Sequence, residues 1–115
     1  MRRIIVSVIA LLTLSGPGFA HSFLLSSSPA AGMIVSSPSR LRLAFGEGVE
    51  PALTGLSLKC VGADVAPVGE PTLSPDNRVL ELALPTLPKG VCNVQWHAVS
   101  VDGHRTEGEF GFTVR

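Results

Sequence analysis

Aromatic residues are scarce in this 115-residue chain, which has no tyrosine, one tryptophan and five phenylalanines. So few aromatic side chains make a poor surface for stacking on sugar rings, which argues against an enzyme that binds polysaccharides. Basic residues are also few. Without the first 20 residues, seven lysines and arginines stand against nine acidic residues, a formal charge of −2. Nucleic-acid binding calls for a basic face, so we expect none.

Long apolar runs are absent except at the start of the chain. Arg2 and Arg3 precede an uncharged, mostly apolar stretch over residues 4–14, and residues 15–20 end with small side chains at Gly18 and Ala20. This order is typical of a cleavable secretory signal, and the run is shorter than the ~20 residues of a membrane-spanning helix. We therefore predict a signal peptide over residues 1–20 and a mature, soluble secreted domain over residues 21–115.

Apolar residues recur at every second position in five segments of the mature chain, and prolines and glycines separate the segments. The alternating sets are Leu41, Leu43, Phe45; Leu56, Leu58, Cys60; Leu80, Leu82, Leu84; Val94, Trp96, Ala98; and Phe110, Phe112, Val114. Such alternation predicts strands with one buried face, and no amphipathic helix is evident. Short strands at this spacing indicate an all-β fold, an antiparallel β-sandwich with Greek-key connections. We expect Trp96 to anchor the core between the sheets.

Cys60 and Cys92 each fall in phase with the inward residues of their strands, so the two can meet across the core. In an oxidising compartment two cysteines make one bridge, and we favour a disulfide. A thiolate pair for Cu(I), which soft sulfur ligands select, and two free thiols stay open as alternatives. Sequence alone does not give the separation of the two side chains.

Two features of the mature sequence predict a metal site. Cleavage after Ala20 makes His21 the first residue, and a terminal histidine offers its α-amine and its ring Nδ1 to one metal as a chelate. Asp102 and His104, on either side of Gly103, add one oxygen and one nitrogen. Three nitrogens and one oxygen in a tetragonal arrangement suit Cu(II), the divalent ion with the highest affinity for such ligands. The alternative is an ordinary hairpin turn, in which Asp and Gly serve turn geometry.

Over essentially the whole mature chain the sequence resembles the CopC/PcoC family of periplasmic copper-binding proteins. The shared features are the histidine start, the turn at residues 28–32, and the segments 41–47, 90–96, 99–104 and 108–114. The resemblance implies an immunoglobulin-like sandwich of about seven strands and one Cu(II) per chain, held by His21, Asp102 and His104. It also implies a role in copper resistance or supply, beside an inner-membrane copper transporter of the CopD type.

The chain departs from that family in three ways, one of which is Cys92, which stands where the family often has a tyrosine. Its founding members have a methionine-rich loop suited to Cu(I), whereas the mature chain here has only Met33, so we expect no thioether site. Gly46 replaces the serine that usually precedes the family's acidic residue, Glu47, which we expect to be a solvated turn carboxylate. His97 alternates out of phase with Trp96, so we expect it on the outer face of its strand. Whether Glu47 or His97 lies near the metal stays open.

Three classes of function are compatible with these residues. We favour a monomeric, non-enzymatic copper carrier or buffer, in which a closed site holds Cu(II) and passes it on. The second class is an oxidative copper enzyme with a histidine brace, which needs an open coordination position where Asp102 is expected to bind. The third is a metal-free β-sandwich that serves as an interaction module.

Overall fold

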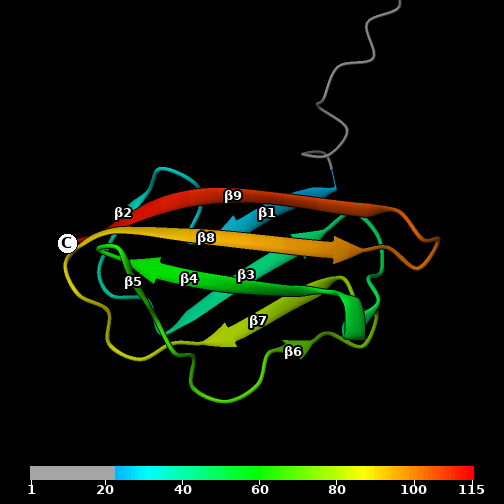
Figure 1. Ribbon diagram of the computed structural model, residues 1–115, viewed down its shortest axis with the longest axis horizontal. Coiled ribbons are helices and arrows are strands. Elements are labelled where there is room, and N and C mark those ends of the chain that lie inside the picture. Colours follow the sequence, from blue (N-terminus) through cyan, green and yellow to red (C-terminus); the bar gives the residue numbers. More distant parts are fainter. Residues whose placement is uncertain (1–22) are drawn as a thin grey trace, which may run out of the picture.

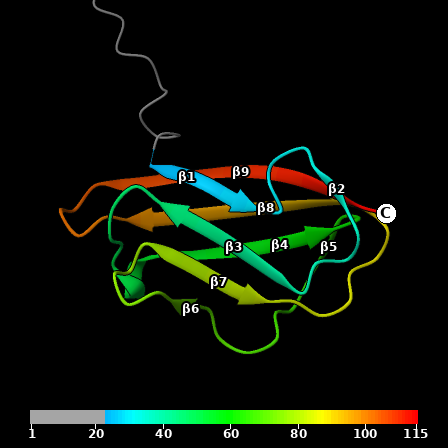
Figure 2. The ribbon, with the colours of Figure 1, turned by 180° about the vertical axis from the view of Figure 1, so that it is seen from behind.

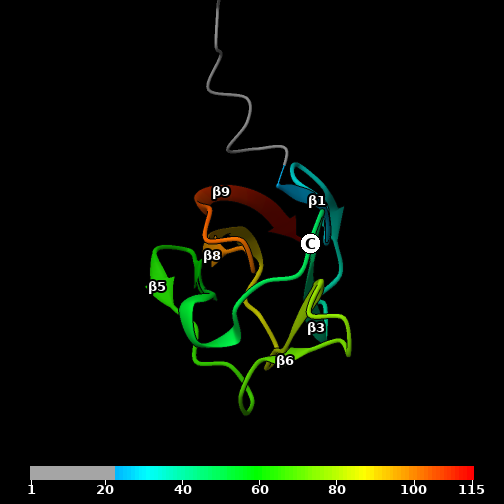
Figure 3. The ribbon, with the colours of Figure 1, turned by 90° about the vertical axis from the view of Figure 1, so that its right-hand side faces the viewer.

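The computed structural model describes residues 23–115, which form two β-sheets (Figure 1). The elements are β1 (Leu24–Ser28), β2 (Ile34–Val35), β3 (Arg40–Phe45), the 3-10 helix η1 (Pro51–Leu53), β4 (Gly55–Cys60), β5 (Ala63–Asp64), β6 (Thr72–Leu73), β7 (Val79–Ala83), β8 (Gly90–Val99) and β9 (Arg105–Val114). One sheet has the strand order β1-β3-β7-β6 and the other the order β2-β9-β8-β4-β5. Figure 3 shows them as separate layers, with β1, β3 and β6 in one and β5, β8 and β9 in the other. The predicted β-sandwich is confirmed.

The chain crosses repeatedly between the two sheets, as Greek-key connections do: β3 is followed by β4 in the opposite sheet, and β7 by β8. Strand pairs within the described residues are antiparallel, except that β2 runs parallel to β9. The larger sheet is therefore mixed, which the alternation pattern did not predict. No helix in residues 23–115 has the length and apolar character needed to cross a membrane.

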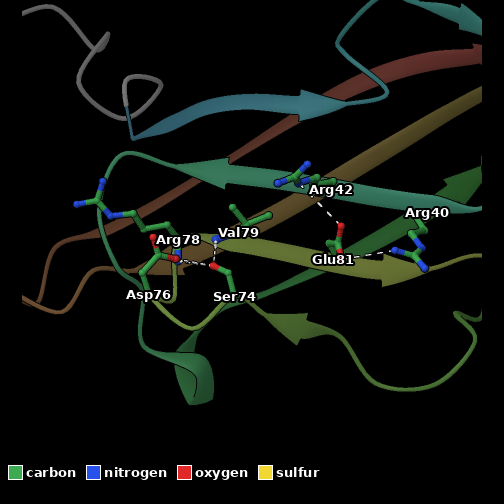
Figure 4. Close-up of polar contacts among 7 residues, drawn as sticks. All are labelled: Arg40, Arg42, Ser74, Asp76, Arg78, Val79 and Glu81. Atoms are coloured by element: carbon green, nitrogen blue, oxygen red, sulfur yellow. Dashed lines mark hydrogen bonds and ion pairs between the residues drawn. The ribbon is translucent and has the colours of Figure 1, made fainter.

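The alternating apolar residues that predicted the strands are buried or partly buried in the structure, and the residues between them are more exposed. Leu41 and Leu43 of β3 are 0% exposed, whereas Arg40 and Arg42 face solvent. The two arginines flank Glu81 of β7, each with an N···O distance of 3.9 Å (Figure 4). Exposed ion pairs of this kind add little to stability, so the buried apolar face holds the sheet in place.

Trp96 of β8 joins the two sheets through aromatic contacts. It is 4% exposed, and its ring packs edge-on to Phe45 of β3 with centroids 5.8 Å apart. Phe45 in turn lies 5.4 Å from the ring of Phe23. Gly108 of β9 faces Trp96, and a Cβ there would lie 2.9 Å from the indole Cζ2, so the ring fills the space that glycine leaves. The prediction that Trp96 anchors the core is confirmed.

Cys60 and Cys92 form the predicted disulfide. The expectation that they meet across the core was wrong, because they face each other on the neighbouring strands β4 and β8 of one sheet, with Cα atoms 4.0 Å apart. The neighbouring residue pair, Val61 and Val91, is hydrogen-bonded, with the Val61 N–H donating to the Val91 carbonyl. The cysteines therefore occupy a non-hydrogen-bonded position of the ladder, where the Cα atoms of facing residues come closest. Alternation predicts which face a residue lies on but not which strands are neighbours. The bridge also rules out a Cu(I) thiolate pair.

Replacing both cysteines with alanine is expected to lower the free energy of unfolding by about 3 to 4 kcal/mol, because the unfolded chain loses a crosslink between residues 32 positions apart. Denaturant unfolding of the oxidised protein and the double variant measures this difference. Metal binding at the far end of β8 should not change. Equal stability of the two proteins would contradict the expectation.

Candidate metal site

The turn that joins β8 to β9 holds Asp102 and His104, two of the three predicted ligands. Its backbone is closed by the Gly103 N–H, which donates to the Ser100 carbonyl at 2.9 Å, and by the Ser100 N–H, which donates to the His104 carbonyl at 2.8 Å. Gly103 has a φ of +93°, which residues with a Cβ rarely adopt. The turn interpretation and the metal interpretation are therefore compatible, since the turn brings both side chains onto one short loop.

Several donors converge on one carboxylate oxygen of Asp102. The Ser100 hydroxyl donates to Oδ1, the main-chain N–H of His104 donates to Oδ1 at 3.4 Å, and His104 Nδ1 lies 3.2 Å from it. The His104 N–H also donates to the Ser100 Oγ at 3.1 Å. Because these contacts use Oδ1, and a carboxylate has two oxygens that accept, Oδ2 can bind a further partner.

These contacts keep Asp102 ionised. The hydrogen bond from Ser100, followed by that from the main chain of His104, lowers the pKa of Asp102 below its ordinary value of 3.8. The ionised form is the one that ligates metals. The folded state therefore binds fewer protons at this residue than the unfolded chain, so its contribution to stability is present above about pH 4 and is lost as the pH falls through the lowered pKa.

Both side chains of the pair are open to solvent, with 81% of His104 and 53% of Asp102 exposed. A carboxylate only accepts hydrogen bonds, so its contact with Nδ1 favours the tautomer of His104 that carries the proton there. The lone pair of Nε2 then points away from the Asp102 carboxylate, so the exposed ring must turn for both residues to bind one ion. The turn can thus offer one nitrogen and one oxygen to an ion arriving from solution.

The start of the described chain is tied to the same end of the sandwich. The Gly46 N–H donates to the Phe23 carbonyl at 2.8 Å, and the Gly48 carbonyl accepts the Val101 N–H at 3.0 Å. Only Glu47 separates the two glycines, so three residues connect Phe23 to the turn. Figures 1 and 2, which view the molecule from opposite sides, both show the beginning of β1 at the end where β8 turns into β9.

The remaining candidates for metal binding have different positions. His21 lies outside the described residues. Within residues 23–115 no group of three or more His, Cys, Asp or Glu side chains is placed to hold a metal ion, so Glu47, partly buried, does not complete a site with Asp102 and His104. His97 is exposed on the outer face of β8, where an added Cβ on the facing Gly55 would lie 3.0 Å from its Cε1. The prediction that His97 faces outward is confirmed.

A second turn repeats the hydrogen bonds of the first. The Ser74 hydroxyl donates to Asp76 Oδ1 at 2.6 Å, and the main-chain N–H of Arg78 donates to both Ser74 Oγ and Asp76 Oδ1 at 3.2 Å (Figure 4). Asn77 stands where the first turn has glycine and also has a positive φ, +57°. As in the first turn, the hydrogen bond from serine is the main cause that lowers the pKa of the aspartate.

The two turns lie on either side of Gly48. A Cβ on Gly48 would be 3.2 Å from the Asp76 carbonyl oxygen and 3.6 Å from Val101 Cγ1. We did not predict this repeated turn from the sequence, although the repeat is visible there. The pattern Ser-x-Asp-x followed by a basic residue occurs at 74–78 and again at 100–104. Only the second copy ends in histidine. Both turns hold a carboxylate, and His104 places an imidazole nitrogen beside it in the second copy.

Comparisons with known proteins agree on one family. Residues 24–115 match the CopC domain. Copper resistance protein C of Xanthomonas campestris pv. juglandis is 31% identical over 118 residues, covering 96% of this chain and 92% of the relative. Copper transport protein CutJ of Bacillus subtilis (strain 168) is 28% identical over 113 residues, 96% of this chain but 21% of the relative. The crystal structure of CopC from Methylosinus trichosporium OB3b has a TM-score of 0.70 at 39% identity, covering 82% of this chain and 93% of that one.

Proposed function

The chain belongs to the CopC family, and we propose that its mature form, beginning at His21, binds one Cu(II) ion through His21, Asp102 and His104. The observation that carries this proposal is the Asp102–His104 pair, held by its turn at the end of the sandwich where the described chain begins. Two side chains do not fill a four-coordinate shell. The chelate from the amine and ring of His21 supplies the other two ligands.

The proposed ligand set favours Cu(II) over Cu(I). It consists of the amine and imidazole nitrogens of His21, one imidazole nitrogen of His104 and one carboxylate oxygen of Asp102, and a tetragonal nitrogen and oxygen shell suits Cu(II). Soft sulfur ligands select Cu(I) instead. The sulfur atoms of both cysteines are in the disulfide, and the described residues contain one methionine, Met33, so sulfur has little part in this site.

The role we propose is that of a periplasmic, monomeric copper carrier or buffer in copper resistance or homeostasis. Two relatives carry copper in their names, one as a resistance protein and one as a transport protein. Because this chain spans only 21% of the transport protein, the CopC-like region there is part of a much longer chain. That linkage supports an inner-membrane copper transporter of the CopD type as the partner to which this domain passes copper.

The described surface argues against the oxidative enzyme. Trp96, the single tryptophan, is 4% exposed, and none of the large hydrophobic residues exposed in residues 23–115 is aromatic. This part of the surface therefore lacks a flat aromatic face for a sugar. Assaying the copper-loaded protein for peroxide-dependent cleavage of polysaccharides separates an enzyme from a carrier, and we expect no cleavage above free copper.

Adding Cu(II) to the protein purified from the periplasm is expected to give one tightly bound ion with a nitrogen-rich tetragonal spectrum. Electron paramagnetic resonance reports the ligands, and native mass spectrometry of the same sample reports the stoichiometry, the cleavage site and the disulfide together. A spectrum that requires sulfur ligands would contradict the assignment, as would a second ion bound equally tightly. A protein that binds no copper would be a metal-free interaction module.

A further inference from the structure

Ser100 is the one buried polar residue in the part of the chain that the structure describes, with 0% of its surface exposed. It directly follows β8 and continues the series of inward residues on that strand, which are all buried and bear no hydroxyl: Cys92, Val94, Trp96 and Ala98. A buried hydroxyl costs free energy unless it is hydrogen-bonded. Alanine would continue the series without that cost, so the packing of the core does not explain a serine here.

The hydroxyl of Ser100 connects the two candidate ligands. A serine hydroxyl donates one hydrogen bond and accepts others. Here it donates to Asp102 Oδ1 and accepts the main-chain N–H of His104 at 3.1 Å. The serine itself is fixed by the bridge between Val49 and Ser100 and by the closing hydrogen bonds of the turn. The Ser100 Oγ atom therefore links the carboxylate of Asp102 to the backbone of His104 by two hydrogen bonds.

The turn at Ser74 shows that this geometry does not depend on a histidine. Its hydroxyl makes the same two contacts, to Asp76 Oδ1 and to the main-chain N–H of Arg78. The arrangement is thus a local consequence of the Ser-x-Asp sequence. In the turn at Ser100 the same contacts hold the carboxylate of Asp102.

We propose that Ser100 is a positioning residue of the copper site: its hydroxyl holds the carboxylate of Asp102 and the backbone of His104 in place, so that both residues can reach one ion. This inference rests on the proposed function, since it concerns how the same site is organised. Ser100 does not ligate copper itself. Partners that orient metal ligands typically change affinity by about 10–100-fold when they are removed.

The test compares Ser100→Ala with Ser74→Ala in the protein that begins at His21. Both substitutions remove a hydroxyl that makes these two contacts, and that of Ser74 also accepts the Val79 N–H at 3.0 Å, but only Ser100 lies in the proposed site. We expect Ser100→Ala to weaken Cu(II) binding about 10–100-fold, measured by titration against a competing chelator, and to alter the electron paramagnetic resonance spectrum. Ser74→Ala should leave both unchanged. Ser100→Thr keeps the hydroxyl and should restore the wild-type spectrum.

Each outcome decides a different question. If Ser100→Ala binds copper with wild-type affinity and spectrum while His104→Ala does not, the positioning role is wrong and the proposed function stands. If Ser100→Ala and Ser74→Ala weaken copper binding equally, the effect is a general loss of stability, and the positioning role is again wrong. If the wild-type protein does not bind Cu(II), the proposed function fails, and the inference that rests on it fails with it. Thermal unfolding of each variant confirms that folded protein is being compared.

Discussion

Retaining the four residues that precede His21, so that the chain begins at Pro17, is expected to weaken Cu(II) binding by more than ~100-fold. Loss of a partner that only orients a ligand typically weakens binding by about 10–100-fold, and this change removes a ligand itself. The extension converts the α-amine of His21 into an amide, which is not basic at neutral pH. The new terminal amine, on Pro17, is four positions before His21, which keeps it from chelating together with the histidine ring. The β-sandwich should be unaffected, since the extension adds nothing to residues 23–115.

The comparison uses calorimetric titration with Cu(II) at one pH, for protein beginning at His21 and protein beginning at Pro17. The matched control appends the same four residues after Arg115, which lies at the opposite end of β9 from the turn. It should bind copper as tightly as the unextended protein. Equal affinities for all three would remove the terminal amine from the site and leave Asp102 and His104 as a weak surface contact.

Alternation predicted the strands that cross the core and missed those at the edges. β3, β4, β7, β8 and β9 each have an inward apolar face, which alternation detects. β1 has the sequence Leu-Leu-Ser-Ser-Ser with no such alternation, because it pairs with β3 alone at the edge of its sheet. The strands β2, β5 and β6 have two residues each, too few to show a period. Hydrogen bonding to neighbours far away in sequence defines them.

The sequence predicted the Asp102–His104 pair but not what holds it. Spacing along the chain is informative for residues two positions apart in a turn, so their contact could be expected. The role of Ser100 depends on burial and on the direction of its hydroxyl, and serine in a sequence has no fixed partner. The disulfide shows the same limit: the phase of each cysteine was correct, but the neighbouring strand was found only in the structure.

Asp102→Ala and His104→Ala are expected to abolish tight Cu(II) binding with little loss of stability, whereas Trp96→Ala should lower the free energy of unfolding by about 3 to 5 kcal/mol. The reason is where the side chains lie. Those of Asp102 and His104 are 53% and 81% exposed in a turn, while Trp96 is 4% exposed and packs on Phe45 across the two sheets. Removing the indole leaves a cavity between the two sheets.

The repeated turn provides matched controls for this prediction. Asp76→Ala removes the same carboxylate contacts as Asp102→Ala, and Arg78→Ala truncates the residue that corresponds to His104. Both controls should bind Cu(II) as the wild type does. Denaturant unfolding and copper titration of all five variants then separate stability from ligation, because the turn variants at 102 and 104 lose binding and Trp96→Ala loses stability. If Asp76→Ala weakened copper binding as much as Asp102→Ala, the carboxylates would act through the shared packing around Gly48, and Asp102 would not be a ligand.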